Sequence, residues 1–187
     1  MHQIPLGSGW IEVICGSMFA GKTQELIRRL RLAAIARQKV QVFKHKLDIR
    51  YSREDLVSHD RIRIPSVPVR RAEDIIDKVR AGTQVVGVDE AHFFSGKIAT
   101  VCQTLADRGL RVIVAGLDQD YRARPFESMA RLMAVAEQVD KYLAICLVCG
   151  APAGRSQRVS DGKKRIDVGH ADKYEARCRR CFRPEKG

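Results

Sequence analysis

Short apolar runs alternate along the chain with segments whose apolar residues recur at helical spacing. The runs are nearly continuous and rich in β-branched residues, which predicts strands buried on both faces of a sheet. The segments between them place apolar residues three or four positions apart, which predicts amphipathic helices. The predicted strands are residues 10–15, 40–43, 84–88, 111–116 and 141–145, and the predicted helices are residues 26–37, 72–79, 98–107 and 126–137.

This order of elements predicts an α/β fold with a mainly parallel sheet over residues 1–143. Residues 44–68 are polar, contain two prolines and show no convincing periodicity, so we expect a long loop, and loops of that length are usually functional. The composition changes after about Cys146, which predicts a small second unit over residues 144–187. In parallel α/β sheets, ligands bind beyond the carboxyl ends of the strands, so the chemistry is expected there.

The first predicted strand leads directly into a complete GxxxxGK[ST] motif, which precedes the first predicted helix. Glycines let backbone N–H groups turn inward around phosphates, and the helix N-terminus adds the positive end of its dipole. Lys22 is expected to reach the β- and γ-phosphates, and the Thr23 hydroxyl to join a Mg²⁺ shell. A chance glycine turn would lack this strand and helix context. The motif predicts ATP or GTP binding by Gly16, Ser17, Met18, Phe19, Ala20, Gly21, Lys22 and Thr23.

Two adjacent carboxylates, Asp89 and Glu90, follow another predicted strand and are expected at the same sheet edge. Asp89 has the position of a second Mg²⁺ anchor, and Glu90 could take a proton from the group that attacks the γ-phosphate. Water as the attacking group would make the protein an ATPase, and a substrate hydroxyl would make it a kinase. Two such acids on their own could equally be helix caps or ion-pair partners. Residues 89–92 also spell the DEAH box of helicases, but a translocating motor needs two such domains and this chain has the length of one.

Four of the six cysteines form two CxxC pairs, and the other two stand alone in apolar segments. Four thiolates at this spacing predict a tetrahedral structural Zn²⁺ site that closes a 28-residue loop, residues 150–177. A redox CxxC or two disulfides are the alternatives. The lone thiols, Cys15 and Cys102, favour a reducing compartment, so we expect a cytoplasmic protein. The predicted zinc ligands are Cys146, Cys149, Cys178 and Cys181.

The charge of the chain admits a second interpretation. The 187 residues carry 34 Lys and Arg against 22 Asp and Glu, a formal charge of +12, and the stretch from Cys146 onward supplies half of that excess. A zinc-bearing P-loop ATPase that binds nucleic acid through its basic C-terminal unit is therefore an alternative. Aromatic residues, at 6%, offer few platforms for base stacking, which disfavours it. No apolar run approaches the length of a membrane span, and we expect neither a signal peptide nor a membrane partner.

Taken in order, these motifs resemble those of the cytosolic-type thymidine kinases, over nearly the whole chain. That resemblance implies a RecA-like P-loop domain with a small zinc-ribbon-like lasso domain. The stretches that carry it are the loop at 16–23 with its Met18-Phe19 pair, Asp48-Ile49-Arg50-Tyr51-Ser52, Ser58-His59-Asp60, Asp89-Glu90-Ala91-His92-Phe93-Phe94, Gly116-Leu117-Asp118, Arg124-Pro125-Phe126, both CxxC pairs and Ala171-Asp172-Lys173-Tyr174.

The resemblance implies transfer of the γ-phosphoryl group of ATP to the 5′-hydroxyl of thymidine or deoxyuridine, in deoxynucleotide salvage. Glu90 would be the base, Lys22 and Arg50 would stabilise phosphate charge, and Thr23 and Asp89 would hold Mg²⁺. Further ATP contacts are implied at Asp48 and His92. Nucleoside contacts are implied at Met18, Phe93, Leu117, Tyr121, Ser156 and Tyr174, and through the main chain of the lasso at Arg165, Ile166, Asp167, Val168 and Gly169.

The resemblance also implies a homotetramer and feedback inhibition by thymidine triphosphate. His92 stands where the family usually has glutamine, and Tyr121 where it often has phenylalanine. Because zinc would offset the entropy of ordering the lasso, loss of Cys178 is expected to weaken nucleoside binding more than ATP binding.

Overall fold

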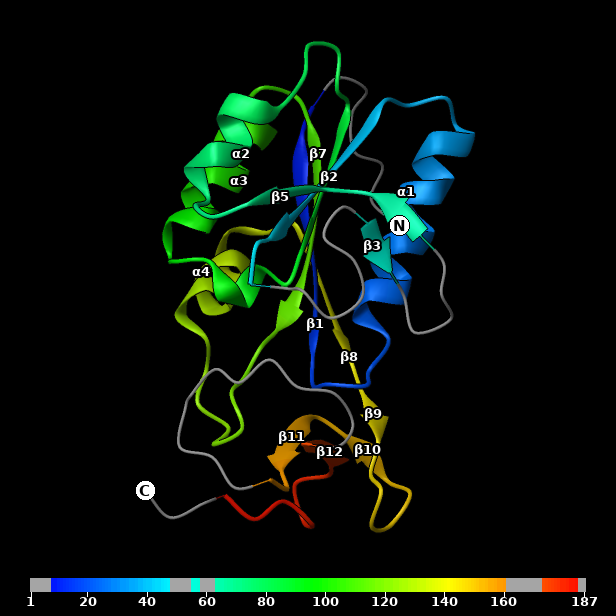
Figure 1. Cartoon of the computed structure of the whole chain (residues 1–187), viewed down its shortest axis with the longest axis vertical. Coiled ribbons are helices and arrows are strands. Elements are labelled where there is room, and N and C mark those ends of the chain that lie inside the picture. The colour runs from blue at the N-terminus through cyan, green and yellow to red at the C-terminus, as the bar shows by residue number, and fades with distance from the viewer. Residues whose placement is uncertain (1–7, 48–54, 58–62, 161–172, 185–187) are drawn as a thin grey trace.

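A six-stranded sheet, parallel throughout, forms the centre of the computed structural model, which describes residues 8–47, 55–57, 63–160 and 173–184 (Figure 1). Each neighbouring pair of strands runs parallel, which confirms the predicted α/β architecture. Across the sheet, the strands are β5 (Val67–Val69), β2 (Val40–His45), β6 (Val85–Asp89), β7 (Arg111–Leu117), β1 (Trp10–Gly16) and β8 (Gln138–Tyr142).

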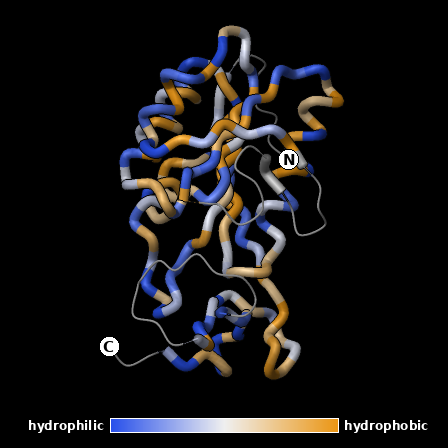
Figure 2. The backbone as a smooth tube through the Cα atoms, viewed as in Figure 1, coloured by the Kyte–Doolittle hydropathy of each residue, from blue (hydrophilic) through white to orange (hydrophobic). Residues whose placement is uncertain are grey.

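Helices cover both faces of this sheet (Figure 1). One face carries α1 (Lys22–Ile35), and the other carries α2 (Glu73–Lys78), α3 (Lys97–Asp107) and α4 (Glu127–Val135), with a short 3-10 turn, η1 (Ala91–Phe93), after β6. Side chains of one strand alternate between the two layers: Val112 and Val114 of β7 pack toward α3 and α4, whereas Ile113 and Ala115 pack toward α1. Figure 2 shows the hydrophobic residues concentrated along these central strands.

A buried ion-pair network fixes α1 against the sheet. The Arg29 guanidinium donates to Glu12 of β1 at 2.7 Å, to Glu25 one turn earlier at 2.8 Å, and to Asp140 of β8 at 2.7 Å. Arg111 of β7 also donates to Glu12, at 2.6 Å. The arginine partners hold the pKa of Glu12 below its usual range against the opposing effect of burial. No helix in the described parts of the chain is long and apolar enough to cross a membrane.

Two of the predicted elements are wrong in detail. The expected loop at 44–68 contains β5 and the short strands β3 (Asp55–Val57) and β4 (Arg63–Pro65), which pair with each other. Strands of three residues are too short to show a period, and Pro68 in β5 is tolerated because β5 lies at the sheet edge. The expected strand at 141–145 is two strands, because β8 ends in the main sheet at Tyr142 and β9 (Ala144–Ile145) begins a separate pairing.

The four cysteines lie in a small region beyond the carboxyl ends of the central strands (Figure 1). We call this region, residues 144–160 and 173–184, the cysteine unit. In it β9 pairs with β10 (Pro152–Ala153), and β11 (Arg155–Arg158) pairs with β12 (Tyr174–Arg177). Its apolar cluster contains small side chains: Ala144, Ala153, Ala176 and two of the cysteines, packed with Ala20 from the loop after β1.

Candidate active site

The GxxxxGK[ST] motif forms the turn between β1 and α1. β1 ends at Gly16, which has φ +138°, and a Cβ there would lie 2.1 Å from the carbonyl oxygen of Tyr142. Gly21, with φ +78°, lies at the N-cap position of α1. Only glycine accepts such positions without strain. The Lys22 ammonium donates to the carbonyl oxygen of Ser17 at 2.7 Å, so the lysine lies over its own loop. The turn has the form of a phosphate-binding loop at a helix N-terminus.

Thr23 and Asp89 meet at this edge of the sheet, as their positions in the sequence predict. Asp89 is the last residue of β6, is 3% exposed, and accepts a hydrogen bond at Oδ2 from the Thr23 hydroxyl at 3.1 Å. Two oxygen ligands at adjacent corners of a Mg²⁺ octahedron lie about 2.9 Å apart, given metal–oxygen distances of about 2.1 Å. The separation and the hard oxygen donors of this pair therefore fit Mg²⁺.

Glu90, the residue after Asp89, has a left-handed backbone with φ 52° and is 7% exposed. Left-handed conformations of non-glycine residues are costly and concentrate at functional sites. The chain reverses here from β6 into η1, so that Asp89 and Glu90 occupy the loop edge of the sheet together. Glu90 Oε2 lies 3.3 Å from Nδ1 of His92.

Three sets of contacts involve the described residues of the implied nucleoside pocket. The Met18 amide donates to the Ser156 hydroxyl at 3.0 Å, which brings the phosphate loop and the cysteine unit together. The Leu117 amide donates to Nδ1 of His92 at 3.2 Å, and the His92 ring packs on Phe93 with centroids 4.2 Å apart.

The third set contains the two pocket tyrosines. The Arg158 guanidinium lies 3.8 Å from the ring centroid of Tyr121 and donates to the Tyr174 hydroxyl at 2.9 Å. All three residues are buried. Arg158 was not predicted from the sequence, where it is one of many basic residues, and its alternation with Ser156 on β11 was the only signal available.

The remaining predicted residues of this site lie outside the described parts of the chain. These are Asp48 and Arg50 on the nucleotide side, and Arg165, Ile166, Asp167, Val168 and Gly169 on the nucleoside side. Their predicted roles stay predictions. The described chain ends on either side of them at Leu47, Ser160 and Lys173.

The four predicted zinc ligands converge. Their sulfur atoms all lie within 4.8 Å of one another, and Cys149 lies 3.6 Å from both Cys178 and Cys181. Thiolates around a tetrahedral Zn²⁺, at about 2.3 Å from the metal, lie about 3.8 Å apart, so the cluster fits a closed structural site. Burial acts to raise the pKa of Cys146, but backbone N–H groups, that of Cys178 foremost, lower it to about 6. Such donors stabilise the thiolate form that a metal requires.

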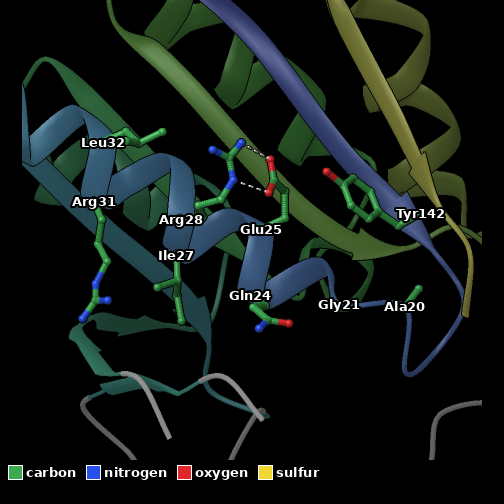
Figure 3. A pocket seen from close by; sticks show the side chains of 9 residues that line it. All are labelled: Ala20, Gly21, Gln24, Glu25, Ile27, Arg28, Arg31, Leu32 and Tyr142. Carbon is green, nitrogen blue, oxygen red and sulfur yellow. Dashed lines mark hydrogen bonds and ion pairs between the residues drawn. The ribbon is translucent and has the colours of Figure 1, made fainter. Parts of the chain in front are cut away.

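A cavity of about 490 Å³ beside the phosphate loop was not predicted from the sequence (Figure 3). It begins at Ala20 and Gly21 and continues along the outer side of α1, with Ile27 and Leu32 as apolar lining. Figure 3 shows the Tyr142 ring at one side and the Arg28 guanidinium held by Glu25 at another. All of its lining residues except Tyr142 lie between Ala20 and Leu32, and the helical periodicity of this segment gives no sign that the surface beside it is hollow.

The fold and the site together define a P-loop nucleotide-binding protein with a phosphate loop, an oxygen-donor pair whose spacing fits Mg²⁺, an adjacent carboxylate and a cysteine cluster suited to zinc. Residues 9–182 match the family model described as thymidine kinase. The chain is 60% identical to a thymidine kinase of Rhodothermus sp. over 95% of its own length and 83% of the relative. It is 54% identical to a thymidine kinase of Bdellovibrio bacteriovorus over 95% of its length and 87% of the relative. The chain belongs to the thymidine kinase family.

Proposed function

We propose that this protein is an ATP-dependent thymidine kinase, which transfers the γ-phosphoryl group to the 5′-hydroxyl of thymidine or deoxyuridine and supplies the monophosphate for DNA synthesis. One observation carries the proposal: the phosphate loop, the Thr23–Asp89 pair and the Glu90 carboxylate occupy one end of the sheet, next to buried tyrosines. The family relationship and the 54–60% identity to named thymidine kinases support the choice of acceptor.

Phosphoryl transfer depends mainly on positioning and on charge stabilisation, and the described residues supply both. The backbone amides of residues 16–23 would surround the phosphates, and Lys22 would exchange its Ser17 contact for a phosphate oxygen. Thr23 and Asp89 would hold Mg²⁺, which when bound neutralises the developing phosphate charge. Glu90 would accept the proton of the attacking 5′-hydroxyl.

The nucleoside would bind between the P-loop and the cysteine unit. Met18, Phe93 and Leu117 would contact the base from the sheet side, and Tyr121, Ser156 and Tyr174 would close the pocket from the other. The lasso, residues 165–169, would read the pyrimidine edge through main-chain groups. Zn²⁺ in the cysteine cluster would anchor both ends of the lasso, since two ligands precede it and two follow it.

The cavity along α1 would take the adenosine part of ATP. It opens at Ala20 and Gly21, so a phosphate chain bound in the loop leads directly into it. Its apolar lining matches a purine base, and the polar side chains at its edge, Gln24, Arg31 and the Arg28–Glu25 pair, match the sugar.

Two broader features complete the proposal. Ile35 on α1, at 77% exposed, is an apolar side chain that a subunit interface would cover, and the family resemblance implies a homotetramer. Buried Cys15 and Cys102 thiols support a reducing compartment, the cytoplasm.

A product assay tests the proposed function. Purified protein, Mg-ATP and a panel of nucleosides would be incubated, and nucleoside monophosphates measured by mass spectrometry. Thymidine monophosphate is expected from the wild type, and Glu90→Gln is expected to lower its rate about 10²- to 10⁴-fold with little change in ATP affinity. ADP and free phosphate without any nucleotide product would instead establish an ATPase, and stimulation of that hydrolysis by DNA would favour the nucleic-acid alternative.

A further inference from the structure

We propose that His92 is a positioning residue that binds the end of β7 and limits where the Glu90 carboxylate can lie. The inference rests on the proposed function, in which Glu90 is the base and Leu117 contacts the nucleoside. It goes beyond that function because it gives His92 a role in positioning Glu90 and Leu117 relative to each other, in place of a direct contact with ATP.

The imidazole is enclosed at the meeting point of two strand ends. Its side chain is 2% exposed, and its ring packs between Phe93, with centroids 4.2 Å apart, and Phe126 at 5.0 Å. One ring nitrogen, Nδ1, faces both partners: the Leu117 amide nitrogen at 3.2 Å and Glu90 Oε2 at 3.3 Å. Leu117 is the last residue of β7, and Glu90 directly follows β6, the neighbouring strand.

The hydrogen-bond chemistry decides what Nδ1 does. The Leu117 amide can only donate, so Nδ1 accepts, and the neutral ring then carries its proton on Nε2. The same nitrogen cannot donate to Glu90 at the same time. Nδ1 and Oε2 then face each other as two acceptors without a hydrogen bond between them. The ring therefore limits the position of Oε2 by steric contact and repulsion, because it prevents the carboxylate from moving toward β7. A side chain that served only to fill space would not bind the Leu117 amide.

This arrangement predicts a particular kinetic pattern. Losing the imidazole should displace Glu90, which lowers kcat, and should loosen the end of β7, which raises the KM for thymidine. The KM for ATP should change least, because neither contact is made to the loop at 16–23 itself, and among the described strand pairings Leu117 connects to that loop only through Gly16, its partner in the β1–β7 pairing. A displacement of about 1 Å at a reacting group can cost about 10²-fold in rate.

The test compares His92→Met with His92→Gln in the full-length protein. The two side chains have similar length and flexibility, but only glutamine offers a strong acceptor to the Leu117 amide. We expect His92→Met to lower kcat about 10- to 100-fold and to raise the KM for thymidine several-fold, with the KM for ATP within about twofold of wild type. His92→Gln should recover kcat to within about threefold. Ile98→Val, a conservative change in the buried core of α3, controls for general loss of stability.

Three results would overturn the inference. The first is an unchanged kcat in His92→Met, and the second is an equal loss of kcat in His92→Gln and His92→Met. The third is a loss of kcat in Ile98→Val as large as that in His92→Met when the two variants have the same melting temperature. If His92→Met fails to fold, His92→Asn replaces it, because its shorter amide keeps the polarity but not the reach, and it should lose kcat while His92→Gln does not. A wild-type protein without thymidine monophosphate product would overturn the proposed function itself. The inference alone fails if the wild type is active and the variants do not differ.

Discussion

The main sheet and the cysteine unit hold their residues at the candidate site in different ways. In the sheet, Gly16, Asp89 and Leu117 end strands that are buried on both faces and covered by helices. Their positions follow from a large apolar core. The cysteine unit has short strands of two to four residues and a cluster of small side chains, too little apolar surface to order it by burial alone. A metal ion bound by its four thiols would supply the missing constraint.

Two hydrogen bonds connect the phosphate loop, which follows β1 of the main sheet, to the cysteine unit. The Ser17 hydroxyl donates to the carbonyl oxygen of Ala153 at 3.0 Å, and the Met18 amide donates to the Ser156 hydroxyl at 3.0 Å. Two consecutive residues of the phosphate loop, Ser17 and Met18, are therefore hydrogen-bonded to the cysteine unit. The conformation of the phosphate loop should therefore depend both on the packed core of the main sheet and on the metal site of the cysteine unit.

Removing the metal should give the largest effect. We expect Cys178→Ser to lose zinc, because three thiolates leave the tetrahedral site incomplete. The main sheet should stay folded, since its core contains no cysteine ligand. Both thymidine and ATP should bind at least tenfold more weakly, whereas the sequence by itself leads one to expect a loss mainly for thymidine. Metal content, circular dichroism and calorimetric titration of each ligand would measure this.

Cys102→Ser is the matched control, because Cys102 is buried in α3 and has no part in the cluster. It should retain zinc and both affinities. If Cys178→Ser weakened the binding of thymidine but not of ATP, the phosphate loop would not depend on its two hydrogen bonds to the cysteine unit. If it unfolded the sheet as well, the distinction between the two regions would be wrong.

The same contrast explains how far the sequence could predict the structure. Strong periodicity and intact motifs predicted the central strands, the phosphate loop, the Thr23–Asp89 meeting and the cysteine cluster. These depend on local patterns and on strand ends sharing an edge. Arg158 could not be predicted, because its contact with Tyr121 arises where segments distant in sequence pack together. The cavity along α1 could not be predicted, because a helical period shows which face is apolar but not where the surface is hollow. Strand β5 was missed because three residues with a proline carry no period.

A single hydroxyl should give a smaller effect. Ser156→Ala leaves the partly buried Met18 amide without this partner, and the cost should lie at the lower end of the about 1–3 kcal/mol of a buried unsatisfied donor. Because that amide belongs to the phosphate loop, we expect ATP affinity to fall about 5- to 10-fold while zinc content stays normal. Isothermal titration with a non-hydrolysable ATP analogue would measure it.

Ser128→Ala provides the comparison for Ser156→Ala. Ser128 is a buried serine on α4, 3% exposed, and has no contact with the phosphate loop among the described hydrogen bonds. Its replacement should leave ATP affinity unchanged. An ATP affinity that does not change in Ser156→Ala would show that the phosphate loop keeps its conformation without the cysteine unit.

The smallest predicted effect concerns Glu25, which lies on α1 against the main sheet, and depends on pH. Hydrogen bonds from Arg28, opposed by burial and joined by those from Arg29, lower the pKa of Glu25 from 4.5 to about 2. A depressed folded-state pKa gives stability that is present above pH 4.5 and lost as the pH falls toward 2. Glu25→Gln should therefore lower the free energy of unfolding by about 0.5–1 kcal/mol at pH 7 and flatten its decline between these pH values.

Urea unfolding of the wild type and Glu25→Gln across this pH range would measure the effect. A chelator is present throughout, so that pH-dependent metal binding by the cysteine unit does not contribute to the measured stability. An equally steep decline in the variant would assign the acid sensitivity to other carboxylates of the network, Glu12 foremost.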